Sequence, residues 1–84
     1  MGFKLTKKEV ETLGVKFAEM LLHDKEANPA NLPGLAKSKD WKKAEPYEKK
    51  SVITEIAQKA RAALLECGYS KELVEKRTAK FIRY

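Results

Sequence analysis

Cysteine and histidine are almost absent from this sequence of 84 residues, and their scarcity excludes several kinds of site. The single cysteine, Cys67, cannot form an intramolecular disulfide, which favours a reducing compartment, the cytoplasm. The single histidine, His23, adjoins Asp24, and neighbouring residues of a helix point in different directions, so the two form no catalytic dyad. One His and one Cys without HxxxH or CxxC spacing give no metal site. We therefore expect no enzyme activity and no metal.

Glycine-rich loops and long apolar runs are also missing. The four glycines are scattered along the chain, so no loop resembles a phosphate-binding loop, and we expect no cofactor. The richest apolar stretch, residues 17–22, is flanked by Lys16 and His23 and is far shorter than the roughly 20 residues of a membrane span. The amino terminus lacks the apolar segment of a secretory signal. These absences predict a soluble protein without a membrane partner.

Apolar residues with helical spacing are what the sequence does contain. Thr6 and Glu9 have the spacing of a capping box, in which each side chain binds the backbone N–H of the other residue. After them, apolar residues recur at steps of three and four, the period of one helix face. The pattern predicts a first helix over residues 7–25.

A loop should follow, because two prolines and a glycine occur between residues 28 and 34. We expect Leu32 and Leu35 to anchor this loop to the core. Ser38 is a suitable N-cap for a short helical turn, residues 39–44, that carries Trp41.

The longest predicted helix begins near Pro46, since proline suits a first turn, and ends before Gly68, a residue typical of a helix C-terminus. Its alanines should let the first helix approach closely. The apolar stripe that should be buried, with Cys67 as a packing residue at its end, comprises Ile53, Ile56, Ala57, Ala60, Ala63, Leu64 and Cys67.

Ser70 is placed to cap a last helix with a shorter apolar edge that includes Val74, Phe81 and Ile82. Together these elements predict an all-α fold: one domain, residues 1–84, with three main helices and a short helical turn in a small bundle. The expected core comprises Leu13, Phe17, Leu21, Trp41, Ile53, Ile56, Ala60, Leu64 and Val74.

The formal net charge is +6, and the basic residues gather in two segments. The candidate partner-binding residues are Lys37, Lys39, Lys42, Lys43, Lys49 and Lys50 in the first segment, and Lys76, Arg77, Lys80 and Arg83 in the second. Basic groups with aromatic residues among them are typical of nucleic-acid contacts. In the first segment the aromatic residues are Trp41 and Tyr47, which are either contact residues or plugs of the core with the lysines as a solvated rim.

Residues 41–49, Trp-Lys-Lys-Ala-Glu-Pro-Tyr-Glu-Lys, and the helix end at residues 60–69, Ala-Arg-Ala-Ala-Leu-Leu-Glu-Cys-Gly-Tyr, resemble the second half of an RyR domain. This is the repeat of ryanodine receptors, which also occurs in small bacterial and phage proteins. The family's Gly-Trp-x-Tyr-Gly segment is missing here, so the resemblance implies no ligand-binding residue. It implies a helical, non-enzymatic recognition module.

Charge and fold together predict a non-enzymatic binding module of bacterial or phage type. The expected partner is a protein with an acidic surface, which the basic face would attract in the manner of an inhibitor or adaptor. The alternative is nucleic-acid binding without sequence preference, because lysines contact phosphates rather than bases.

Overall fold

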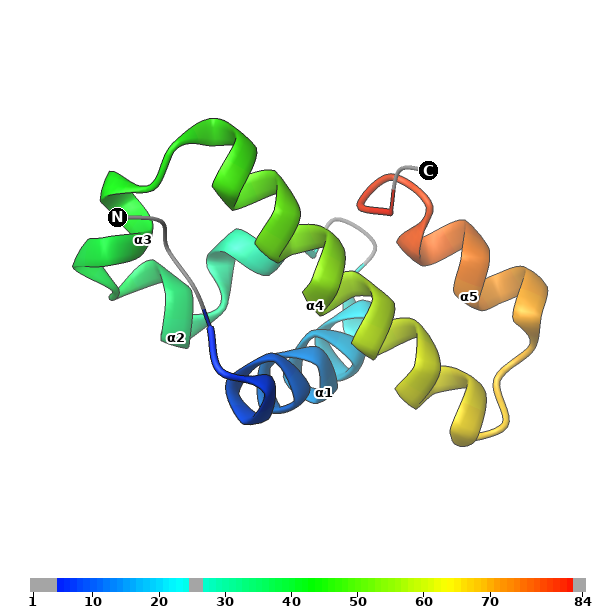
Figure 1. The fold of residues 1–84 in the computed structure, drawn as a ribbon. Helices are drawn as coiled ribbons and strands as arrows, with labels where there is room; N and C mark the ends of the chain where they lie inside the picture. The colour runs from blue at the N-terminus through cyan, green and yellow to red at the C-terminus, as the bar shows by residue number, and fades with distance from the viewer. Residues whose placement is uncertain (1–4, 25–26, 83–84) are drawn as a thin grey trace.

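The computed structural model describes residues 5–24 and 27–82 of the chain. The helical segments, in chain order, are α1 (Lys7–His23), the 3-10 turn η1 (Pro29–Asn31), α2 (Pro33–Ala36), α3 (Lys39–Lys43), α4 (Pro46–Glu66) and α5 (Lys71–Thr78) (Figure 1). The described part of the chain contains no strand, and α1, α4 and α5 are its three main helices. The predicted all-α fold class is confirmed.

The first helix begins as the capping box predicts. The Glu9 N–H donates to the Thr6 hydroxyl at 3.1 Å, and the Thr6 N–H donates to a Glu9 carboxylate oxygen at 3.1 Å. Helix α1 ends at His23, and the N–H of Asp24 still donates to the Met20 carbonyl. The last predicted residue of this helix, Lys25, lies outside the described residues.

The loop after α1 is held to the core by the two predicted anchors, since Leu32 and Leu35 are each only 1% exposed. Ser38 caps α3, with its hydroxyl accepting a hydrogen bond from the Trp41 N–H at 3.2 Å. This places the indole of Trp41 in the core, where it is 6% exposed. The two anchors and the cap of the short helical turn are therefore as predicted. The predicted loop, however, contains the turn η1 and the short helix α2, and α3 ends at Lys43, with Ala44 as its C-cap.

The ends of α4 follow from single residues. Pro46 occupies the first turn, where its missing N–H is not needed. Gly68 has a φ of 94°, a left-handed conformation that lets the Tyr69 N–H return to the Leu64 carbonyl at 3.2 Å. The chain then turns into α5, which Ser70 caps by accepting a hydrogen bond from the Leu73 N–H.

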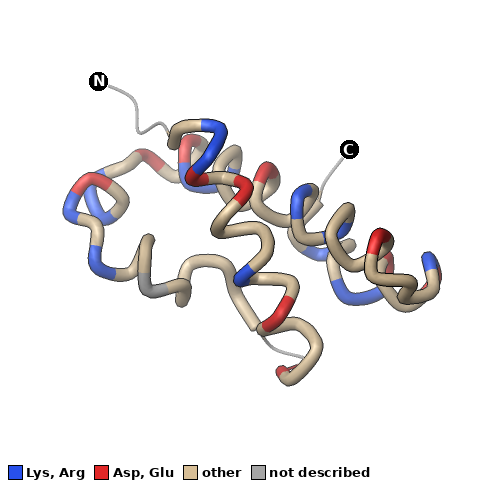
Figure 2. Tube along the Cα trace, turned by 90° about the horizontal axis from the view of Figure 1, so that it is seen from below, with Lys and Arg blue, Asp and Glu red and all other residues tan. Residues whose placement is uncertain are grey.

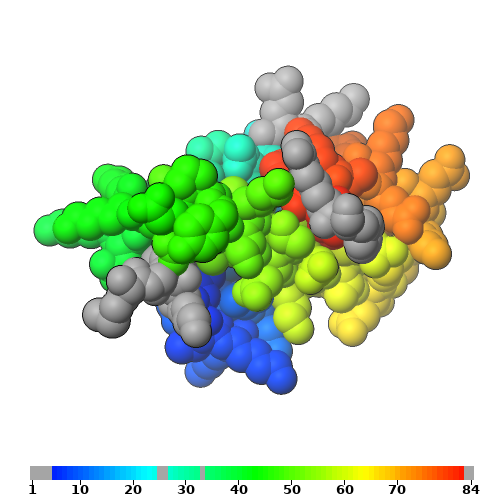
Figure 3. Space-filling model, turned by 45° about the horizontal axis from the view of Figure 1, so that its top comes forward, coloured from blue at the N-terminus to red at the C-terminus, as the bar shows by residue number. Residues whose placement is uncertain are grey.

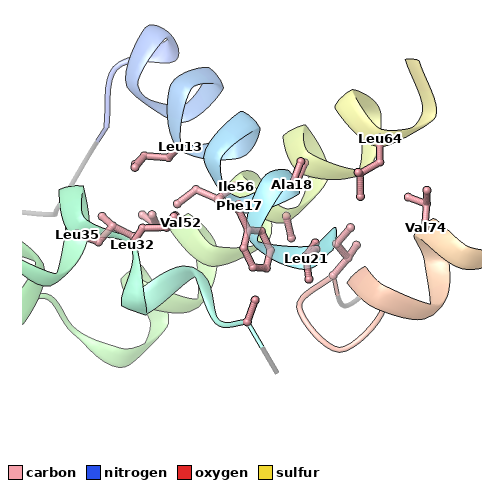
Figure 4. Packing of buried hydrophobic residues seen from close by; sticks show 14 of the residues in the cluster. Leu13, Phe17, Ala18, Leu21, Leu32, Leu35, Val52, Ile56, Leu64 and Val74 are labelled. Atoms are coloured by element: carbon pink, nitrogen blue, oxygen red, sulfur yellow. The ribbon is translucent and has the colours of Figure 1, made fainter. Parts of the chain in front are cut away.

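The core forms mainly where α1 crosses α4, with the loop leucines on one side and α5 on the other (Figures 1 and 4). Phe17, Ile56, Ala57 and Ala60 have no exposed surface at all. All but one of the predicted core residues are buried: Leu13, Phe17, Leu21, Trp41, Ile56, Ala60, Leu64 and Val74.

The exception is Ile53, which is only partly buried and packs against the edge of the core. Its neighbour Val52, outside the predicted stripe, is 5% exposed and belongs to the core instead. The apolar stripe of α4 is wider than the surface that its neighbours cover, so one edge of the stripe remains open.

Cys67 also differs from the prediction, because the structure places it on the surface. It is the C-cap residue of α4, and the last buried residue of that helix is Leu64. The expectation of a buried, packing cysteine is therefore wrong.

The C-terminal segment is tied to the rest of the fold by side chains. Arg61 of α4 and Glu75 of α5 form an ion pair at 3.0 Å. Beyond α5, the Thr54 hydroxyl donates to the Phe81 carbonyl at 3.2 Å and shares the same hydrogen with the Lys50 carbonyl at 2.9 Å. The ring of Phe81 packs edge to face with that of Phe17, with centroids 5.3 Å apart. These contacts bring residues after α5 against the first half of α4.

Candidate interaction surface

The first basic segment surrounds α3 at one end of the molecule, where lysines outnumber acidic residues (Figure 2). Its members Lys37, Lys39, Lys42, Lys43 and Lys50 are exposed, and Lys49 is partly buried. Lys42 and Lys43 lie in the last turn of α3, where the partial negative charge of a helix C-terminus favours cations. The positions of these lysines are thus compatible with both the solvated rim and a contact surface.

The two aromatic residues of this segment have opposite environments. Trp41 is 6% exposed, and its ring is contacted by the Lys49 ammonium at 5.9 Å from the centroid. Tyr47 is 72% exposed. Trp41 is therefore a buried core residue, whereas Tyr47 is the aromatic residue of this segment that is accessible to a partner.

The second basic segment is less uniform than its sequence suggests. Lys76 and Lys80 are exposed. Arg77 is partly buried and donates from Nη1 to the Leu21 carbonyl at 3.1 Å, so it ties α5 to the end of α1. Arg83, also a predicted contact residue, lies outside the described residues.

A groove joins the two basic segments at the open edge of α4. It has a volume of about 460 Å³ and is lined by Asn28, Pro46, Lys49, Lys50, Ile53, Lys80 and Phe81. Figure 3 shows the start of α4 and the turn that follows α5 on the same face of the molecule. We call this the α4 groove. Lys49 and Lys50 of the first segment thus share one surface feature with Lys80 of the second.

Sequence reasoning missed the α4 groove because it depends on the return of the chain after α5. The spacing of Lys50 and Lys80 carries no signal of their proximity. The apolar residue that marks the groove, Ile53, has the helical spacing of a core residue.

A second groove, of about 410 Å³, lies between the ends of α1 and α4 and the start of α5. Three of its lining side chains are among the large apolar residues that the structure leaves exposed: Leu22 at 41%, Tyr69 at 40% and Leu73 at 38%. His23 and Arg77 also line it. Its rim therefore has fewer free cations than that of the α4 groove, because Arg77 is engaged with the end of α1.

In residues 5–24 and 27–82, no three His, Cys, Asp or Glu side chains come together as a metal site would require. No helix among these residues combines the length and the apolar character needed to cross a bilayer.

Comparison with known proteins gave no match to a family model, a curated protein sequence or a solved structure. The resemblance of residues 41–49 and 60–69 to an RyR domain therefore stays a prediction from sequence. The residues of this chain and their geometry carry the functional argument.

Proposed function

We propose that this protein is a non-enzymatic interaction module that binds an acidic surface of a partner protein. Its contact surface is the basic face, which we define as Lys37, Lys39, Lys42, Lys43, Lys49, Lys50 and Lys80. The observation that carries the proposal is that these lysines lie just before α3, on α3, at the start of α4 and in the adjoining C-terminal turn, and that six of the seven residues are exposed. The resemblance to RyR domains supports the same class of function.

The contribution of such lysines is expected mainly in the rate of association. An exposed ion pair contributes only about 0–1 kcal/mol, since water screens it and the side chains lose freedom. A field of like charges nevertheless steers an oppositely charged partner, and such steering raises association rates by about 10–10³-fold at low salt.

Nucleic-acid binding is the second candidate, and the exposed lysines support it equally well. The aromatic residues do not, because bases stack on accessible rings and Trp41 is buried. In the first basic segment, only Tyr47 offers an exposed ring. We therefore rank an acidic protein above a nucleic acid.

The test uses two charge-reversal variants with equal net charge. Lys42→Glu with Lys43→Glu alters the basic face, whereas Lys8→Glu with Lys16→Glu alters exposed lysines of α1. Proteins captured from a nuclease-treated lysate are identified by mass spectrometry, and association of the purified partner is then followed by stopped flow. We expect the first variant to slow association about tenfold at low salt and the second to leave it nearly unchanged.

An equal association rate for the wild type and the Lys42→Glu, Lys43→Glu variant would contradict the proposal. The second candidate would be established instead if the immobilised protein captured no partner from the nuclease-treated lysate. It would then also have to bind single-stranded DNA with an affinity that falls steeply as the salt concentration rises.

A further inference from the structure

The α4 groove combines an apolar floor with a cationic rim, and this combination specifies more than an acidic surface. We propose that the groove receives one bulky apolar side chain from an acidic segment of the partner protein, with carboxylates on either side of that side chain meeting the rim. The inference rests on the proposed function and adds a location and a motif to it.

The floor consists of apolar groups that the fold itself leaves uncovered. Ile53 has the spacing of a core residue, yet it is only partly buried at the edge of the core. Phe81 is also partly buried, and Pro46 adds the apolar ring of the first turn of α4. An apolar side chain placed here would remove all three surfaces from water, which is favourable in proportion to the apolar area buried.

The walls of the groove are fixed before any partner arrives. The Thr54 hydroxyl shares its hydrogen between the Lys50 carbonyl at 2.9 Å and the Phe81 carbonyl at 3.2 Å, which places the C-terminal turn against α4. Within that turn, the Phe81 N–H donates to the Thr78 carbonyl at 3.0 Å. Phe81 is held from the other side by the edge-to-face contact with Phe17. Binding would therefore require little ordering of the protein, and preorganised sites lose less free energy on association.

The rim is cationic on both sides. Lys49 and Lys50 line it from α4, and Lys80 lines it from the C-terminal turn. Two of these ammonium groups lie near aromatic rings: that of Lys80 is 5.1 Å from the Phe81 centroid and that of Lys49 is 5.9 Å from the Trp41 centroid. No carboxylate belongs to the described lining residues, so an acidic segment would meet attraction from both walls.

The same contacts disfavour a nucleobase as the occupant. A base binds best on an accessible aromatic face. The ring of Phe81 already contacts Phe17 and the ammonium group of Lys80, and Ile53 and Pro46 offer no flat aromatic surface. An aliphatic or aromatic side chain of a peptide can bind through apolar contacts alone and does not need an accessible aromatic face.

The experiment uses two short fluorescein-labelled peptides of Glu and Asp residues that differ only at the centre, where one has Trp and the other Ala. Labelled oligothymidylate is the third probe. Fluorescence anisotropy measures the affinity of each probe for the wild type, for Lys50→Glu with Lys80→Glu, and for the control Lys8→Glu with Lys16→Glu. Titrations of ¹⁵N-labelled protein then locate the bound peptide.

We expect the Trp peptide to bind the wild type about tenfold more tightly than the Ala peptide, as burial of one large apolar side chain predicts. Its binding should shift the amide signals of Ile53 and Phe81 more than the Ala peptide does. The groove variant should lose the advantage of Trp, and the control should keep it.

Equal affinities of the two peptides for the wild type would overturn the inference while the basic face stayed a valid contact surface. An advantage of Trp that persists in the groove variant would overturn it as well, because the anchor would then lie elsewhere, for example at Leu73. Binding of oligothymidylate together with no binding of either peptide would overturn both the inference and the proposed function.

Discussion

Gly14 of α1 lies directly against Lys59 of α4. A Cβ atom at position 14 would be 2.5 Å from the Cβ of Lys59 and 3.3 Å from the backbone nitrogen of Ala60. The missing side chain of Gly14, together with Ala57 and Ala60 on the buried face of α4, sets how closely the two helices cross. This crossing forms most of the core.

Replacement of Gly14 by alanine should therefore destabilise the protein. Alanine improves helix propensity by about 1 kcal/mol. The steric cost of an overpacked core is about 1–3 kcal/mol, and the Cβ of Lys59 cannot rotate away because it is bonded to the helix backbone. We expect a net loss of about 1 kcal/mol in the free energy of unfolding, measured by urea denaturation.

Gly34→Ala is the matched control, since the near contact of a Cβ there among the described residues would be the far end of one side chain, Cδ2 of Leu13 at 3.1 Å, and not a Cβ or backbone atom of a helix. The variant should lose less stability than Gly14→Ala. An equal or larger loss would show that close packing at the α1–α4 crossing is not the cause.

The helix ends could be predicted from sequence because the residues that set them act locally. Thr6, Ser38 and Ser70 each cap the N–H groups of the next turn, and Gly68 adopts the left-handed conformation that other residues avoid. Such signals depend on three or four neighbouring residues. These signals can be read from sequence because they do not require knowledge of any tertiary contact.

Features that depend on which face a neighbour covers could not be predicted. Val52 belongs to the core in place of the predicted Ile53, and this depends on which face of α4 the neighbouring helices cover. The exposure of Cys67 likewise depends on how far along α4 the neighbouring helices reach. The exposure of the lysines was predictable from their charge. The meeting of Lys50 with Lys80 was not, because it requires the return of the chain after α5.

Gly68→Ala should destabilise the protein by a different mechanism. A Cβ at this position would meet no atom of the described residues within 4 Å, so the expected cost comes from the φ of 94°. The left-handed conformation costs an alanine about 1–2 kcal/mol relative to glycine. Thermal and urea unfolding should show a loss in that range and a smaller loss for Gly68→Asn, because Asn tolerates this conformation. A loss for Asn that matched the loss for Ala would argue against a backbone origin.

Arg77→Gln should lower stability by about 1 kcal/mol, because the Leu21 carbonyl loses the donor that links α1 to α5. Lys76→Gln is the control on the same helix, at an exposed position, and should change the free energy of unfolding by less than about 0.5 kcal/mol. Equal effects would show that general charge, and not the hydrogen bond, determines the result. Arg77 variants are therefore unsuited to testing partner binding alone.

Cys67 should react with a thiol reagent such as DTNB in native buffer, since the structure exposes it. We expect complete modification without denaturant, and Cys67→Ser should change the free energy of unfolding by no more than about 0.5 kcal/mol. Modification that proceeds only in denaturant would restore the interpretation of Cys67 as a packing residue.

The capping box of α1 should give the folded state a measurable dependence on acid pH. Hydrogen bonds from the backbone and the hydroxyl of Thr6 hold the pKa of Glu9 below its ordinary value of 4.5. Glu9 therefore binds a proton less readily in the folded than in the unfolded chain. Its stabilising contribution is fully present above pH 4.5 and is lost as the pH falls through the lowered folded-state pKa.

Glu9→Gln isolates this contribution, because Gln can complete a capping box but does not titrate. Urea unfolding from pH 7 down to pH 3 should show that the stability difference between wild type and variant, in favour of the wild type, shrinks as the pH falls below 4.5. In the Thr6→Ala background the same Glu9→Gln change should give a smaller pH-dependent difference, since the Thr6 hydroxyl is lost while the Thr6 backbone N–H, the larger cause of the low pKa, remains. A constant difference between wild type and Glu9→Gln across this range would mean that the Thr6 hydrogen bonds do not favour the charged form of Glu9.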